Sequence, residues 1–260
     1  MVNDWHFFEK KGYGAVFSRL KAATSFLGGQ ALYGDKGLRM MIERTEDVSN
    51  IIRSPVSMEI VVWSHESERS RVICAKDFKD TSVGRKNLLK FIKASASFPG
   101  LFPPEKINNE IYSDGYSCIL NSFFECDTVF FIDSGQPRQL AETAKPRWNL
   151  YLMKAIVGLI DRRVEDEIVH FVKKNKFKIF PSDPDAYSTI TWKNILKRTK
   201  KVRPKPNKRF IFIAPTLHIP SLQIDKFNNK NGDISKIIDH GYERPKEILS
   251  ILSTSPPSQY

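Results

Sequence analysis

Residues 94–121 constrain the fold of this 260-residue chain more than any other stretch, since they join several rigid elements in a fixed order. The stretch reads ASASFPGLFPPEKINNEIYSDGYSCILN. It begins at the end of a predicted amphipathic helix and passes through an elbow that contains Pro99, Pro103 and Pro104. A predicted short hairpin follows and ends at Asp114-Gly115. An aspartate at the carboxyl end of a strand can act as a base in a crevice, although an Asp-Gly pair alone is more typical of a tight turn.

Strand-like and helix-like patterns alternate on both sides of this stretch. Residues 59–64 and 71–75 are rich in β-branched residues and flank a polar loop, which predicts paired strands. The apolar run 127–133 predicts a strand buried on both faces, as in a parallel sheet. Further helices are predicted at 36–52, 85–94, 148–171 and 233–252, the last broken at Pro245, and further strands at 176–181 and 209–215. The pattern favours a layered α/β domain with a largely parallel sheet.

The chain is long enough for one sizeable core, so we predict a single domain over 1–260, with 1–30 as a poorly placed amino-terminal segment. Its formal charge of +12 is concentrated in 193–209, which holds nine basic residues and no acid. This run is either a solvated basic connector or a contact for the phosphates of an anionic lipid surface or a nucleic acid. The candidate contacts for anionic lipid are Lys193, Lys197, Arg198, Lys200, Lys201 and Arg203.

Several observations bear on compartment and cofactors. The amino terminus lacks the regions of a signal peptide, and the longest nearly apolar run, 151–160, is too short to span a bilayer. The sequence contains an odd number of cysteines, which are not spaced like metal ligands: Cys74, Cys118 and Cys126. This pattern favours reduced thiols. The histidines are scattered, so neither a metal nor a cofactor is predicted. We expect an intracellular protein, either cytoplasmic or bound peripherally to a membrane.

Taken together, the A-S-A-S helix end, the elbow ending in F-P-P and the strand Y-x-D-G resemble the patatin-like phospholipases and acyl hydrolases. The strand motif corresponds to Tyr112, Asp114 and Gly115, whereas Tyr116 stands where the family has glycine or alanine. A weaker likeness covers roughly residues 30 to 252. The resemblance implies a three-layer fold with a mostly parallel central sheet between helices, and a lipid or phospholipid substrate at a membrane surface, without a cofactor.

Membership of this family implies a Ser–Asp dyad, in which Asp114 is the general base that takes the proton of a nucleophilic serine. The serine is expected in a G-x-S-x-G turn upstream of the D-G motif, after a glycine-rich loop that binds the oxyanion. Neither feature is found in this sequence. Ser18, Ser25, Ser49, Ser54 and Ser57, for example, lie upstream but have no flanking glycines.

Three hypotheses therefore stay open. The chain is an amino-terminally incomplete acyl hydrolase, an inactive lipid-binding or scaffolding protein of the same fold, or a nucleic-acid-associated protein that uses 193–209. The first hypothesis predicts no ester turnover by these 260 residues alone. It also predicts that the strand at 127–133 lacks a partner along one edge, because the absent strands lie beside its counterpart in the family. A further carboxylate at a strand end, Asp133, is expected to be structural.

Overall fold

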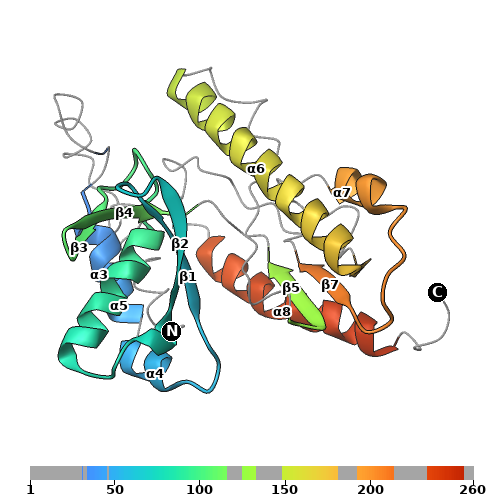
Figure 1. Ribbon diagram of the computed structural model, residues 1–260, viewed down its shortest axis with the longest axis horizontal. Helices are drawn as coiled ribbons and strands as arrows, with labels where there is room; N and C mark the ends of the chain where they lie inside the picture. The colour runs from blue at the N-terminus through green and yellow to red at the C-terminus, as the bar shows by residue number, and fades with distance from the viewer. Residues whose placement is uncertain are drawn as a thin grey trace. The chain divides into compact units, whose positions relative to one another are not determined.

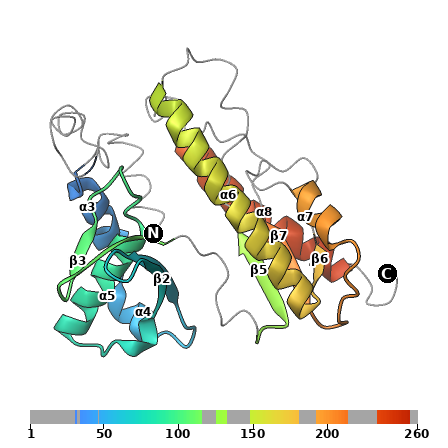
Figure 2. The same cartoon turned by 45° about the horizontal axis from the view of Figure 1, so that its top comes forward.

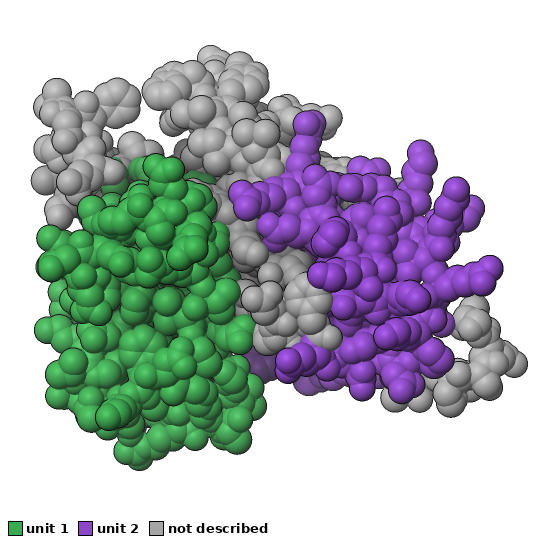
Figure 3. Space-filling view, viewed as in Figure 1, with its two compact units in different colours: residues 1–117 green, residues 118–260 purple. Residues whose placement is uncertain are grey.

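The computed structural model is a mixed α/β protein with two compact units, 1–117 and 118–260, coloured separately in Figure 3. The structure describes residues 31, 34–45, 47–115, 125–132, 148–180, 192–213 and 233–254. The predicted amino-terminal segment 1–30, Asp133 and Tyr116 lie outside these residues. Within the described helices, none has both the length and the apolar character that a membrane crossing requires.

Unit 1 contains a four-stranded antiparallel sheet in the order β2-β1-β4-β3 (Figure 1). Its strands are β1 (Glu59–Ser64), β2 (Arg69–Cys74), β3 (Glu105–Ile107) and β4 (Glu110–Asp114). Its helices are α3 (Lys36–Thr45), α4 (Val48–Arg53), η2 (Ala75–Asp77) and α5 (Ser82–Ser95). The pairing of β1 with β2 confirms the predicted strand pair. Between β3 and β4, Asn108 and Asn109 both have positive φ (50° and 68°), which is typical of a two-residue type I′ hairpin.

One face of this sheet packs against α4 and α5. Along β1 the buried positions alternate, so that Ile60 and Val62 point toward the helices. Leu88 and Phe91 of α5 meet them, and the Phe91 ring lies edge-on to the ring of Tyr112 with centroids 5.2 Å apart. This core holds β4 against the amino-terminal strands of the sheet.

The helix predicted over 36–52 is two helices, which corrects the prediction of one. Asp47 is the N-cap of α4, where its carboxylate accepts hydrogen bonds from the Asn50 backbone N–H (3.3 Å) and from Asn50 Nδ2 (2.8 Å). An aspartate that satisfies the free N–H groups of a new helix start favours a break at that point. The helical periodicity of the apolar residues continues across the break, which is why the sequence pattern alone predicts one helix.

The proline elbow connects α5 to β3 through a tight turn. The Leu101 N–H donates to the Phe98 carbonyl (3.0 Å), and Gly100 has φ +83°, so Pro99-Gly100 occupies the centre of a type II turn. Phe102 is then buried in a cluster with Leu38 and Ile42 of α3. The elbow therefore anchors the start of the β3–β4 hairpin on two helices.

Unit 2 contains a three-stranded parallel sheet in the order β5-β7-β6. Its strands are β5 (Thr128–Ile132), β6 (Lys178–Phe180) and β7 (Arg209–Ile213). Its helices are α6 (Trp148–Asn175), α7 (Trp192–Thr199) and α8 (Asp233–Thr254). Phe210 and Phe212 of β7 pack with α6 and α7, whereas Ile211 and Ile213 pack with Ile248 of α8. The sheet thus lies between two helical layers (Figures 1 and 2).

The central strand of this sheet is β7 and not β5, which corrects the prediction for 127–133. Residues 210–213 are all buried. In contrast, β5 lies at an edge among the described strands. Its residues Phe130 and Ile132 are 48% and 71% exposed, and only Val129 of this strand is buried. Each strand has four apolar residues among its five, so only the pairing decides which one is covered on two faces.

Two further segments differ from the predictions. The first part of the segment predicted as a basic connector, 193–199, is helical and belongs to α7, because Ile195 inserts fully into the core against α6. The other is α8, which continues through Pro245. A proline inside a helix removes one backbone hydrogen bond, and the packing of Ile248 on β7 holds the helix beyond it.

Candidate functional site

Asp114 is the last residue of β4 and lies where α5 ends. It pairs directly with Val62 of β1, and directly paired residues point to the same face of a sheet. The Asp114 side chain therefore lies on the face that α5 covers. Its backbone N–H donates to the carbonyl of Ser97, at 3.1 Å, just after the end of α5. The structure thus connects the two most specific parts of the sequence motif through one hydrogen bond.

The small residues of A-S-A-S let the helix end approach the strand. Ala94 and Ser97 are both fully buried, and the Ser97 hydroxyl donates to the carbonyl of Lys93, at 2.8 Å. Larger side chains at these two positions would separate α5 from β4, because buried positions of this kind leave no room for added atoms. The helix end consequently determines the position of the Asp114 backbone.

Gly115 is required by lack of space and not by a left-handed backbone. Among the described glycines, Gly100 has positive φ, whereas Gly115 does not. A Cβ atom at Gly115 would lie 2.5 Å from Val61 Cγ1 and 2.7 Å from the Val61 carbonyl carbon. The Asp-Gly pair therefore differs from the tight turn that such a dipeptide commonly forms, since it brings the chain close to β1.

We expect Gly115→Ala to lower the free energy of unfolding by about 2–3 kcal/mol, since the new methyl group would meet the β1 backbone. Urea denaturation would measure the loss. Gly241→Ala is the matched control, because a Cβ at that helical glycine meets nothing within 4 Å. The control is expected to be stabilising by about 0.5–1 kcal/mol. Equal effects at both positions would contradict the steric explanation.

Burial raises the pKa of the Asp114 carboxyl to about 7, and a hydrogen bond from the Gly115 backbone N–H opposes the rise. Among the described residues, no cation contributes to this pKa. Near neutral pH the carboxyl is therefore present in both protonation states. A carboxylate with a pKa near the working pH is well suited to general-base catalysis.

The other motif residues support the strand and are remote from proton transfer. The Tyr112 hydroxyl donates to Glu110 Oε2 (2.5 Å) and accepts from Arg71 Nη1 (3.3 Å). Burial and the hydrogen bond to Glu110 raise the pKa of Tyr112 to about 12, so it stays protonated. Pro99 forms the turn of the elbow, and Pro103 and Pro104 lead, half-buried, into β3.

No described serine hydroxyl is hydrogen-bonded to the Asp114 carboxylate. A different serine–aspartate pair exists, in which the Ser49 hydroxyl contacts both carboxylate oxygens of Asp80 at 3.0–3.1 Å. Arg53 and Arg85 also bind Asp80. Burial acts to raise the pKa of Asp80, but hydrogen bonds from Ser49 and the two arginines outweigh it and hold the pKa below its ordinary value. A carboxylate held by two cations is a poor base, so this pair serves to crosslink α4 and α5.

A second serine contact was missed by the sequence interpretation. His65 Nε2 lies 3.0 Å from the Ser113 hydroxyl, although the two residues are far apart in the sequence. Ser113 pairs with Trp63 in the sheet and points to the face opposite Asp114, since it is the adjacent strand residue. It is only 2% exposed, so a substrate does not reach its hydroxyl. This contact arises from the pairing of strands that are distant in the sequence, and no local sequence motif predicts it.

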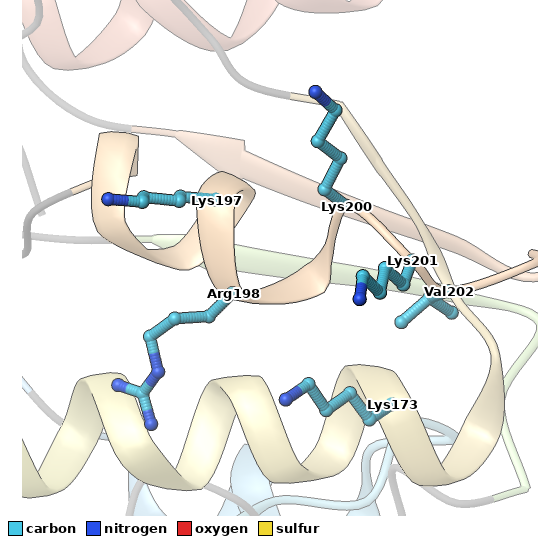
Figure 4. Close-up of a pocket in the computed structure, with 6 residues that line it drawn as sticks. All are labelled: Lys173, Lys197, Arg198, Lys200, Lys201 and Val202. Carbon is cyan, nitrogen blue, oxygen red and sulfur yellow. The ribbon is translucent and has the colours of Figure 1, made fainter.

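The structure brings four of the six predicted basic contacts together in unit 2. Lys197, Arg198, Lys200 and Lys201 line one pocket between α7 and α6 (Figure 4). Lys173 of α6 also lines it, and the sequence interpretation missed this residue. The remaining predicted contacts are Arg203, which is exposed but does not line the pocket, and Lys193, whose side chain lies outside the described residues.

No family model, curated protein or solved structure matches this chain. Within the described ranges, no group of three or more histidine, cysteine, aspartate or glutamate side chains is placed to hold a metal ion. Two features of the described residues therefore bear on function. They are the geometry around Asp114 and the basic pocket of unit 2.

Proposed function

We propose that this chain carries the aspartate half of the Ser–Asp dyad of a patatin-like lipid acyl hydrolase. The proposal rests on the environment of Asp114. This residue lies at a strand end against the A-S-A-S helix terminus, and burial raises the pKa of its carboxyl to about 7. The reaction is hydrolysis of a carboxylic ester of a lipid. In it, the Asp114 carboxylate takes the proton of the serine hydroxyl as the serine oxygen attacks the ester carbonyl.

Two properties of Asp114 suit this role. Since no described cation lies beside it, the carboxylate keeps its basicity, unlike Asp80 with its two arginines. Gly115 lies so close to Val61 that the strand end is held in one position, which fixes the base relative to the sheet. Positioning of the base within hydrogen-bond reach of the nucleophile is the main requirement for such a proton transfer.

The edge position of β5 supports a fold in which further strands complete the sheet of unit 2. Among the described strands, β7 alone pairs with β5, and the exposed Phe130 and Ile132 lie on this edge strand. An apolar strand with an unpaired edge tends to recruit another strand. In the proposed patatin-like fold, the strands that carry the oxyanion loop and the nucleophile occupy this edge.

An inactive lipid-binding or scaffolding protein of the same fold is the second candidate. It is favoured by the observation that Asp114 has no serine partner among the described residues, while a basic pocket is present in unit 2. In that protein, the Asp114 region is retained for the packing of α5 on the sheet. The two candidates differ in a single property, which is the presence of a nucleophile.

We expect the 260-residue chain to hydrolyse no lipid ester and to resist labelling by a fluorophosphonate probe. A protein translated from a longer natural reading frame, with an in-frame G-x-S-x-G segment upstream of Met1, is expected to be labelled at the serine of that segment. In that longer protein, Asp114→Asn should lower ester hydrolysis by about 10²–10⁴-fold, because the general base is lost. Asp80→Asn is the control, since the Asp80 carboxylate is held by Ser49 and two arginines.

Each result separates the alternatives. Labelling of the 260-residue chain at one serine, lost in Asp114→Ala, would show that the dyad is complete here and would reject a missing nucleophile. Equal activity of the longer protein with and without Asp114→Asn would reject Asp114 as the base. An upstream sequence without a serine motif would favour the inactive lipid-binding protein.

A further inference from the structure

The basic pocket in unit 2 has a volume of about 460 Å³ and lies between α7 and the carboxyl end of α6. Five of the six described residues that line it are cationic: Lys173, Lys197, Arg198, Lys200 and Lys201. Figure 4 shows Lys173, Arg198 and Lys201 extending into the space between the two helices, whereas Lys197 and Lys200 point away from its centre. Side chains from two elements therefore converge on one space.

The framework of the pocket is held by the core and by backbone hydrogen bonds. Ile195 is fully buried and anchors α7 on α6, and the Thr199 hydroxyl donates to the Ile195 carbonyl at 2.8 Å. After the helix, the Val202 N–H donates to the Thr199 carbonyl at 2.9 Å. Further along, the Lys205 N–H donates to the Lys176 carbonyl at 2.8 Å. The lysines thus project from a fixed backbone, which lowers the entropic cost of binding a ligand.

The positive charge of the pocket is largely uncompensated. Asp166 forms an ion pair with Arg198 at 2.7 Å, whereas Lys173, Lys197, Lys200 and Lys201 form no ion pair with a described residue. The carboxyl ends of α6 and α7 each contribute about half a negative charge. Counted over all five cations, an excess of about three positive charges remains after these contributions. Lys173, Arg198 and Lys201, which face the space, account for about one of them, and Lys197 and Lys200 add to the positive field around it, so the pocket is complementary to an anionic group.

We propose that this pocket binds a phosphate monoester on the headgroup of an anionic membrane lipid. Such a phosphate carries about 1.5–2 negative charges and three acceptor oxygens, which suit the three converging donors Lys173, Arg198 and Lys201. Arg198 can still donate to a phosphate because its side chain is 43% exposed beside Asp166. This site lies in unit 2 and acts independently of the chemistry at Asp114.

The side chains in and next to the pocket favour a lipid over a nucleic acid. Val202 lines the pocket, and Leu196 of α7 is 37% exposed beside Lys197, so apolar and basic side chains occur together, as on membrane-surface helices. Among the described residues that line the pocket none is aromatic, whereas proteins that bind single-stranded nucleic acid stack bases on aromatic rings. The volume of about 460 Å³ is also in the range of pockets that bind one small ligand or headgroup.

The test measures binding of the full chain to phosphatidylcholine vesicles that contain phosphatidylinositol monophosphate. Vesicles with phosphatidylserine at matched surface charge are the comparison. We expect Lys173→Gln/Lys201→Gln to weaken binding to the phosphoinositide vesicles by roughly 30-fold, from the usual contribution of two lysines near an anionic lipid surface. The control Lys86→Gln/Lys106→Gln removes the same charge from exposed lysines of unit 1 and should change binding by less than about threefold.

Soluble inositol phosphate should compete with the phosphoinositide vesicles, and unchanged thermal unfolding of both double variants should show that they fold. Three outcomes would overturn the proposal. One is equal binding to phosphatidylserine vesicles of the same charge, which would show attraction by surface charge alone. The second is an equal loss in the control variant. The third is salt-dependent binding to single-stranded RNA that is lost in Lys173→Gln/Lys201→Gln, without binding to either kind of vesicle.

Discussion

Asp114→Asn is expected to raise the free energy of unfolding of unit 1 by up to about 4 kcal/mol above about pH 8 and to leave it nearly unchanged below about pH 4. The physical cause is burial, which raises the pKa of this carboxyl from 3.8 in an unfolded chain to about 7. Each pKa unit corresponds to about 1.4 kcal/mol. A neutral amide has no ionised form to desolvate, so the variant avoids the cost.

The direction with pH follows from proton binding. Between about pH 4 and pH 7 the folded protein holds a proton on Asp114 that the unfolded chain has released, so stability falls as the pH rises through this window. Above about pH 7, the pKa of Asp114 in the folded protein, the carboxylate is ionised in both the folded and the unfolded chain, and the full desolvation cost to the folded state persists. The raised pKa is consequently a cost to the fold, in agreement with a group retained for its chemistry.

Urea denaturation at several pH values, followed by hydrogen exchange of β1 and β4, would measure this difference. Asp80→Asn is the matched control because the same substitution should act with the opposite sign. Burial acts to raise the pKa of Asp80, but hydrogen bonds from Ser49, Arg53 and Arg85 outweigh it and lower the pKa. The stability that Asp80 contributes is therefore present above about pH 4 and is lost as the pH falls through the lowered pKa. A pH-independent effect of Asp114→Asn would contradict the raised pKa.

Lys93→Met is expected to lower the free energy of unfolding by about 3–5 kcal/mol, because it removes the cation from a largely buried charge cluster. Lys93 Nζ lies 2.7 Å from Asp35 Oδ2 and 2.5 Å from Glu105 Oε1. The side chains of Lys93 and Glu105 are only 11% and 14% exposed. Burial acts to lower the pKa of Lys93, but its hydrogen bonds to Asp35 and Glu105 outweigh it and raise the pKa.

The location of this cluster explains why its loss should affect the candidate site. Lys93 lies in the last turn of α5, and its carbonyl accepts the hydrogen bond from Ser97, whose own carbonyl binds Asp114. The two carboxylates come from the start of α3 and from β3, so the lysine joins three elements around the motif. Without it, Glu105 is left as a buried charge that lacks its ion-pair partner.

A double variant tests that explanation. If the cost arises from the carboxylate left behind, Lys93→Met/Glu105→Gln should recover much of the stability lost in Lys93→Met. Lys86→Met on the exposed face of the same helix is the control and should change stability by less than about 0.5 kcal/mol. A small loss in Lys93→Met, or no recovery in the double variant, would show that the cluster contributes little.

Local chemistry made the elements around Asp114 predictable. Pro99-Gly100 contains the residues that a type II turn requires, and the Asn108-Asn109 pair suits a hairpin whose central residues have positive φ. The alternation in β1 and the helical spacing of Leu88 and Phe91 show which faces are apolar. Such signals depend on neighbours in the sequence, which is why the order of helix, elbow, hairpin and Asp-Gly agrees with the structure.

Local sequence patterns could not predict the contacts between residues that are distant in the sequence. The buried central strand is β7 and not β5, although both are short apolar runs, because strand pairing alone makes one central and the other an edge. The same limit applies to Lys173, which joins the basic pocket from another helix, and to His65, which meets Ser113 across the sheet. Each of these positions is determined by packing over long sequence separations.

For this protein, the sequence by itself determined the type of most elements, the position of Asp114 at a strand end and the concentration of positive charge in 193–209. Tertiary structure alone decided that Gly115 is needed because β1 is close, that burial brings the pKa of Asp114 to about 7, and that lysines from two helices surround one pocket. The physical reason is that propensity and periodicity act between near neighbours, whereas desolvation and steric contact depend on everything packed around a group.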